Sequence, residues 1–241
     1  MPRDPLSFNS SLVHGYVGCY PFDLVDEKLA EADFFLDKLK DSSLNPFEAR
    51  CYFSAFVSAA RSVTFALQAV MKSRVYGFGE WYESKQEELR QDPLARFFHD
   101  ARTEVQHMGL NLVNAGRVRT IDGKLVADLY FQSSTLGTPL KNAPPYDVVT
   151  SCTRYLTAIV SLIRECYEVF GAAIDPRQYL TEENFSKLGR TIEDAEEEVF
   201  GVRGWTAVPE ASLESRWQML RASVSGSEIG WIFDKYLARP I

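Results

Sequence analysis

The sequence has few of the residues on which metal and redox sites depend. Its 241 residues include four cysteines, at positions 19, 51, 152 and 166, and three histidines, His14, His99 and His107. No two cysteines stand three residues apart, so the zinc and redox pattern C-x-x-C is absent and we expect four reduced thiols. The zinc motif H-E-x-x-H is absent, and E-x-x-H occurs once, at Glu104 and His107, whereas a di-iron bundle needs two such pairs. We therefore expect neither a metal site nor a cofactor.

Glycine-rich phosphate loops are also missing. The motifs G-x-G-x-x-G, G-x-x-x-x-G-K-[ST] and G-x-S-x-G do not occur, which argues against dehydrogenases, P-loop enzymes and common hydrolases. A net charge of −7 and a pI of about 5.1 exclude an overall basic nucleic-acid module, so any contact with RNA must be local. No apolar run begins at the N-terminus, and the most apolar long window, 148–170, holds four charged residues, Arg154, Arg164 and Glu165 among them. We therefore expect no leader peptide, no membrane span and a cytoplasmic protein.

What the sequence does contain is a helical pattern. Apolar residues recur at spacings of three and four, and start signals stand at Asn45-Pro46 and Asp92-Pro93. We expect Gly116 and Gly171 to end two of the helices. The predicted longer helices span about 22–40, 46–72, 92–115 and 147–171, with shorter helices near 79–90, after Asp175, after Thr181 and within 212–237.

One segment has a different period. Alternating residues flank Asp122-Gly123, a strong signal for a β-hairpin over about 117–131. The sequence thus predicts a mainly α protein, an antiparallel helical bundle with an inserted hairpin and extra C-terminal helices. We divide it into a bundle over 1–171, hairpin included, and a C-terminal helical extension over 172–241 that packs on the same domain.

The helix predicted from Asp92 has an unusual polar face. Its apolar residues gather on one side, whereas His99, Thr103 and Gln106 lie opposite, with Arg102 and His107 on the two flanks. A solvated helix face is the simplest interpretation of this pattern.

Two other charged features have a structural interpretation. Arg61 stands in the narrow polar stripe of the apolar helix 46–72, and we expect an ion-pair partner for it because a buried charge needs one. The acidic run Glu193–Glu198 is interpreted as a solvated helix face, or alternatively as a surface for a basic partner.

The stretch FFHDARTEVQHMG contains the pattern R-x4-H from Arg102 to His107. On a late helix of such a bundle, this pattern resembles the motif of the HEPN superfamily, all-α domains found in RNA-cleaving toxins, defence systems and CRISPR effectors. The resemblance covers roughly 20–171 as architecture and 94–110 as sequence. It implies a metal-independent endoribonuclease in which the 2′-hydroxyl of RNA attacks the adjacent phosphate.

The resemblance also implies roles for single residues. His107 is the expected general acid or base, and Arg102 is expected to hold the phosphate. Thr103 or Gln106 is expected to donate a hydrogen bond, with His99 as a further polar group. Five helical steps separate Arg102 from His107 by about 140°, so one helix cannot aim both at one phosphate. A homodimer that joins two copies of the pair follows from this geometry.

Two other interpretations stay open. Thr103 stands where active members often have Asn, Asp or His, and together with the acidic pI this favours an inactive HEPN-like module for dimerisation, nucleotide binding or partner binding. An unrelated helical adaptor is the third interpretation. RNA and an antitoxin or another protein are the partners considered.

Overall fold

The computed structural model describes residues 22–72, 75–109, 111–132 and 143–238, apart from the side chains of residues 106–108. Within this part of the chain, ten helices and one two-stranded antiparallel sheet are formed. The prediction of a mainly α fold with an inserted hairpin is therefore confirmed.

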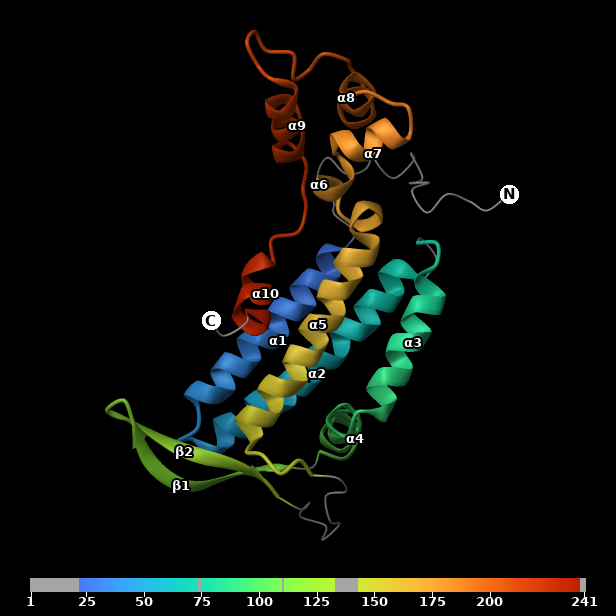
Figure 1. Cartoon of the computed structure of the whole chain (residues 1–241). Coiled ribbons are helices and arrows are strands. Elements are labelled where there is room, and N and C mark those ends of the chain that lie inside the picture. The colour runs from blue at the N-terminus through green and yellow to red at the C-terminus, as the bar shows by residue number, and fades with distance from the viewer. Residues whose placement is uncertain (1–21, 73–74, 110, 133–142, 239–241) are drawn as a thin grey trace.

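The bundle is built on three long helices that lie side by side: α1 (Asp23–Asp41), α2 (Pro46–Met71) and α5 (Val148–Ile174) (Figure 1). α3 (Phe78–Gln91) runs along one flank, and α4 (Pro93–Met108) crosses the bundle near one end. These five elements surround the main hydrophobic core, and α2 contacts α1, α4 and α5.

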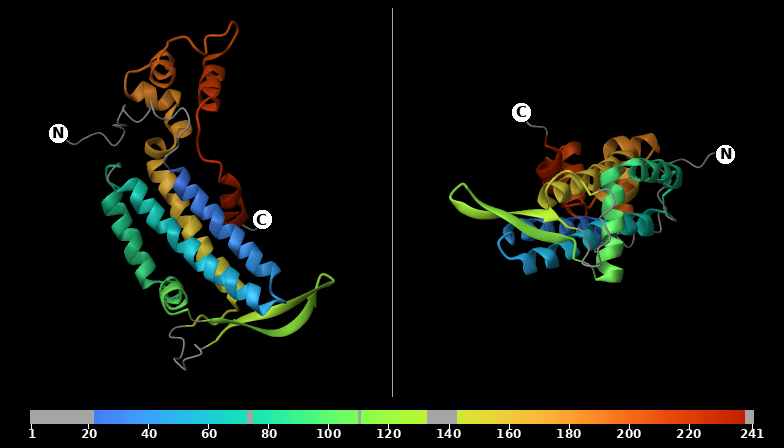
Figure 2. Two further views of the ribbon diagram at one scale, coloured as in Figure 1. Left: turned by 180° about the vertical axis from the view of Figure 1, so that it is seen from behind. Right: turned by 90° about the horizontal axis from the view of Figure 1, so that it is seen from below.

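The remaining elements lie at the two ends of the bundle. The hairpin of β1 (Val113–Ile121) and β2 (Lys124–Phe131) lies across the end of the bundle, against α2 and α5, and its tip extends outward on the side away from α4 (Figure 1 and Figure 2). At the opposite end lie four short helices, and the chain then returns along the bundle as the last helix, which contacts α5. The helices after α5 are α6 (Pro176–Tyr179), α7 (Glu182–Lys187), α8 (Ile192–Phe200), α9 (Leu213–Ala222) and α10 (Gly230–Leu237).

The predicted start signals act as helix caps. The Asn45 side chain accepts hydrogen bonds from the backbone N–H groups of Phe47 and Glu48, and Pro46 occupies the first helical position. Asp92 caps α4 in the same manner through the N–H of Leu94, at 2.7 Å. These caps satisfy backbone donors that have no partner inside the helix, and they fix where α2 and α4 begin.

Two predicted helix ends were wrong. α4 ends at Gly109, whose φ of 62° is left-handed, rather than at Gly116. Gly116 lies in β1 at a shift of register, where a Cβ would stand 3.2 Å from the ring of Tyr130, so the hairpin begins at Val113 instead of 117. Gly171 lies inside α5, under the side chain of Gln178, and that helix continues to Ile174.

The turn of the hairpin is the predicted one. Asp122 and Gly123 both have positive φ, at 49° and 77°, as a two-residue hairpin turn requires. The bundle end of the hairpin joins the core through Leu129, while Ala127 donates its N–H to Ser43 Oγ. The tip carries exposed Val118 and Leu125 beyond the helices.

α2 is the one described helix whose length and composition would suffice to cross a membrane. Half of its most apolar window is buried inside the structure, against the neighbouring helices and β1. Its apolar character is therefore explained by a central place in the bundle core.

The structure has two separate hydrophobic clusters. The larger one joins α1–α5 and the hairpin with α10, which contributes Ile229, Ile232 and Phe233. The smaller one lies wholly within 179–224, around Phe185 and Trp217. The chain therefore builds a small lobe at one end of the bundle and then returns to the main core (Figure 1).

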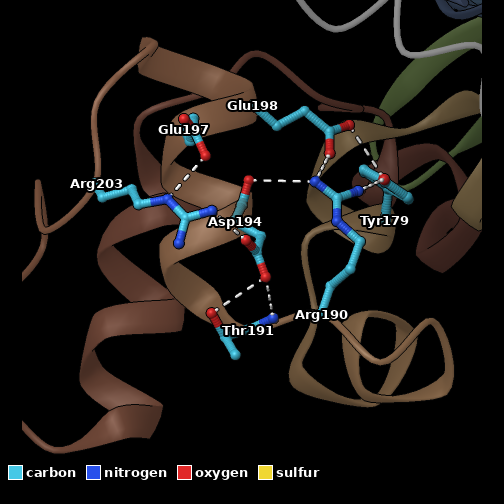
Figure 3. Close-up of polar contacts among 7 residues, drawn as sticks. All are labelled: Tyr179, Arg190, Thr191, Asp194, Glu197, Glu198 and Arg203. Carbon is cyan, nitrogen blue, oxygen red and sulfur yellow. Dashed lines mark hydrogen bonds and ion pairs between the residues drawn. The ribbon is translucent and has the colours of Figure 1, made fainter.

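The acidic run Glu193–Glu198 lies in this lobe and is not a solvated face. Arg190 pairs with Glu198 at 2.6 Å, and Arg203 contacts Asp194 and Glu197 at 2.7 and 2.8 Å (Figure 3). Glu196 is fully buried, where it accepts hydrogen bonds from the N–H groups of Gly204 and Thr206 and pairs with Arg216. The prediction was wrong because Arg190 and Arg203, which flank α8, and Arg216 of α9 pair with these acids.

A buried carboxylate lies where the lobe meets the bundle. Asp26 on α1 is 4% exposed and accepts hydrogen bonds from the hydroxyl of Tyr167, at 2.8 and 2.9 Å, and from Ser227 Oγ, at 2.9 Å. Burial raises the pKa of Asp26 to about 7, against the effect of these hydrogen bonds and in line with the nearby charges of Asp23 and Asp175.

We expect Asp26→Asn to stabilise the protein at alkaline pH. The Asp26 carboxyl group loses its proton near pH 3.8 in the unfolded chain and near pH 7 in the folded chain. The free energy of unfolding of the parent therefore falls as the pH rises between these two values, and it does not recover above pH 7. Relative to the parent, the variant should gain about 2–3 kcal/mol more unfolding free energy at pH 8 than at pH 5. Urea denaturation at the two pH values measures this difference.

Asp37→Asn is the control, because it should change the free energy of unfolding at pH 8 in the opposite direction. Burial would raise the pKa of Asp37, but hydrogen bonds from Lys235 and Lys40 lower it overall. That carboxylate therefore favours the folded state above its unfolded pKa of about 3.9, and its replacement should lower stability at pH 8. An Asp26→Asn gain of equal size at pH 5 and pH 8 would contradict our assignment.

Candidate functional site

The polar face predicted for the helix from Asp92 is present on α4. His99 and Thr103 are exposed, one turn apart, and Thr103 Oγ1 donates to the carbonyl of His99 at 3.3 Å. The Nδ1 of His99 lies 3.3 Å from Oδ1 of Asp100. On the opposite side Phe97, Phe98 and Ala101 are buried in the core, as the helical spacing predicted.

Arg102 and His107 are described to different extents. The Arg102 side chain is half-buried, and its Nε is buried without a hydrogen-bond partner among the described residues. Gln106 and His107 belong to the last turn of α4, but their side chains lie outside the described part of the chain. The predicted pairing of Arg102 with His107 across a dimer is therefore still a prediction.

A cavity of about 540 Å³ lies beside α4, where four helices meet. Its walls come from α2, α3, α4 and α5, and its volume is within the usual range for a small-molecule pocket. Polar and charged side chains make up most of the lining: Arg61, Thr64, Tyr82, Gln86, Arg90, Arg96, His99, Asp100 and Tyr155. Leu89, Ala95 and Ile159 add an apolar wall.

The wall formed by α3 is fixed to the bundle. Lys85 on α3 pairs with Glu165 on α5, with 2.8 Å between Nζ and Oε2. Phe78 stacks on Tyr82, with ring centroids 5.2 Å apart, and meets Phe170 edge to face. These contacts hold Tyr82 at the cavity wall.

Arg61 does not make the expected ion pair. Its guanidinium lies over the ring of Phe65, 4.6 Å from the centroid, and Nη1 donates to Thr64 Oγ1 at 3.3 Å. No carboxylate of the described residues pairs with it. The prediction was wrong because the polar stripe of α2 opens into a cavity instead of facing a buried acid.

Positively charged side chains outnumber negatively charged ones in the lining of the cavity. Arg90 pairs with Glu87 at 3.3 Å, and His99 is close to Asp100. Arg61 and Arg96 line the cavity without an ion pair among the described side chains. Two guanidinium groups thus have donor capacity to spare in a chain with a net charge of −7.

Two phenols complete the polar lining as hydrogen-bond donors. Burial raises the pKa of Tyr155 to about 12, and burial also raises the pKa of Tyr82; the charge of Arg61 opposes both effects. Both hydroxyls are therefore protonated at neutral pH. The ring of Tyr155 stacks on Phe98 with centroids 4.4 Å apart, which fixes its position in the wall.

Of the predicted site residues, the structure places His99 in the cavity lining, but not Arg102 or Thr103. Sequence analysis missed Arg96, Tyr82 and Tyr155, which come from three different helices. Arg61 was recognisable in the sequence as a charged residue on an apolar long helix, but it was interpreted as one half of an ion pair.

These features define a class of mainly α bundle proteins with an inserted hairpin and a cation-lined cavity. The chain belongs to the bacteriophage lambda protein ea47 family, whose model matches residues 16–170. No curated protein and no solved structure matches the chain. All residues that line the cavity lie inside the matched range, whereas α6–α10 lie after it.

We expect the end of α4 to depend on the backbone of Gly109. A Cβ there would meet no atom within 4 Å, so the cost of Gly109→Ala comes from the φ of 62° alone, about 1 kcal/mol of unfolding free energy. Gly109→Asn should cost less, because asparagine tolerates the left-handed region. Chemical denaturation of the three proteins measures this order, and an alanine variant as stable as the parent would contradict it.

Proposed function

We propose that this protein is a HEPN-like, metal-independent endoribonuclease of a toxin or defence system, which acts in the cytoplasm as a homodimer. Arg102 is the observation that supports the proposal most. Its half-buried guanidinium has an Nε without a hydrogen-bond partner among the described residues, although buried donors normally have one. A phosphate oxygen of RNA is a suitable acceptor for this group.

The proposed chemistry uses groups of α4 only. The 2′-hydroxyl of RNA attacks the adjacent phosphorus, its proton passes to a base, and the bond to the 5′-oxygen breaks as that oxygen receives a proton. His107 serves as the acid or base, and Arg102 neutralises the charge that develops on the phosphate oxygens. Thr103, Gln106 and His99 offer further hydrogen bonds. The products are a 2′,3′-cyclic phosphate and a 5′-hydroxyl end.

The homodimer is part of the proposal. Arg102 and His107 are five residues apart on one helix, so a single copy of α4 directs them about 140° apart. Two copies related by a two-fold axis can supply an arginine from one chain and a histidine from the other. An antitoxin or another protein partner would then control access to the shared site.

The second interpretation is a HEPN-like module that binds without cleavage. Thr103 favours it because active members often have Asn, Asp or His at this position, and the net charge of −7 favours it because an acidic chain repels RNA. A helical adaptor unrelated to RNA is the third interpretation. The assay below separates the first interpretation from the other two.

We expect the full chain to cleave a mixed single-stranded RNA in the presence of EDTA and to leave 2′,3′-cyclic phosphate ends. His107→Ala and Arg102→Ala should each reduce the rate at least 100-fold, the usual contribution of a general acid or base and of a charge-stabilising donor. Arg50→Ala is the matched control, because Arg50 is an exposed arginine on α2. Circular dichroism and thermal melting show that each variant is folded.

Mixing the two inactive variants tests the shared site. A heterodimer of Arg102→Ala with His107→Ala keeps one complete pair if the two residues come from different chains, so activity should return after mixing. Sedimentation velocity should show a dimer at micromolar concentration. A monomer, or a folded parent that leaves RNA intact, would exclude the proposed enzyme and favour a binding module or an adaptor.

A further inference from the structure

The cavity between α2, α3, α4 and α5 has the chemistry of an anion site. Arg61 and Arg96 face it without a carboxylate partner among the described side chains, and the hydroxyl and amide groups of Thr64, Tyr82 and Gln86 stand beside them. Guanidinium groups match phosphate oxygens in geometry and charge. A half-buried cation without a partner carries a desolvation cost, which an anionic ligand would offset.

Apolar side chains also line the cavity. They are Leu89, Ala95 and Ile159, and the ring of Tyr155 stacks on Phe98. The volume of about 540 Å³ exceeds the needs of an inorganic phosphate ion and falls in the range for small organic ligands. The lining therefore suits a molecule with a charged end and a flat, largely apolar end.

We propose that this cavity binds a small phosphorylated ligand, with its phosphate held by Arg61 and Arg96 and its ring against the wall of Leu89, Ile159 and Tyr155. His99 on α4 also lines the cavity, and its Nδ1 lies 3.3 Å from Oδ1 of Asp100. The site shares His99 with the proposed RNA site but differs from it otherwise, because Arg102 and Thr103 do not line the cavity. The two proposals can therefore fail separately.

AMP is a suitable probe, since it joins one phosphate to one aromatic ring. We expect AMP at about 5 mM to raise the melting temperature of the full chain, because a ligand that binds only the folded state stabilises it. Adenosine, which lacks the phosphate, should not do so. Inorganic phosphate should bind more weakly than AMP in isothermal titration calorimetry.

Arginine variants locate the binding site. Arg61→Gln and Arg96→Gln should each weaken AMP binding about 10–100-fold, the usual effect of losing a charge-assisted hydrogen bond. Arg50→Gln, the same change on α2, should leave AMP binding intact, because Arg50 lines a different cavity with Cys51 and Val105. Arg102→Ala and His107→Ala should also retain AMP binding.

Folding does not obscure this test. Arg96 is exposed, so its replacement should not disturb the core. Arg61→Gln removes a half-buried cation that makes no ion pair among the described residues, and glutamine can still donate to Thr64, so the variant should melt close to the temperature of the parent without AMP. No response of the parent to AMP, an equal response to adenosine, or full AMP binding by both arginine variants would overturn the proposal. Equal affinity for inorganic phosphate and AMP would contradict the proposed binding of the ligand's ring by the apolar lining residues.

Discussion

α2 is covered by α1 on one side and by α4, α5 and β1 on the others, and its apolar residues form the middle of the main core. The positions of α3, the hairpin and α10 depend on this enclosure, because each of them packs against α2 or against a helix that touches α2. A polar side chain on an enclosed helix such as α2 can reach water or a cavity in few places. Arg61 extends to the edge where α3 and α4 leave a cavity, so the packing of the core determines where that cation lies.

Helix starts and the hairpin turn could be predicted from the sequence, because a few neighbouring residues determine the backbone conformation there. Asn45-Pro46, Asp92-Pro93 and Asp122-Gly123 act through hydrogen bonds and φ angles within a few residues, and all three were predicted. The glycines were harder to interpret. Gly109 and Gly116 both lie near the end of α4, and only the left-handed φ of the first separates a helix end from a glycine in a strand.

The site depended on contacts that the sequence does not reveal. The α4 face that holds His99 and Thr103 could be predicted from a period of 3.6 residues. The cavity could not, because its walls come from four helices spread over about a hundred residues. The acids of α8 were misjudged although their partners are near in the sequence, because the helical period alone does not show that Arg190, Arg203 and Arg216 turn back onto α8.

The path of the chain through the small lobe has a practical consequence. The chain leaves the bundle after α5 and returns as α10, and at the crossing Gly226 passes so close to Asp175 and Arg177 that a Cβ would stand 2.7 Å from them. Shortening the protein after Asp175 would thus strip Ile229, Ile232 and Phe233 from the main core and expose its surface. An internal deletion of 180–224 closed by a short linker would retain them. Any minimal fragment for crystallisation should keep both flanks of the lobe and discard its middle.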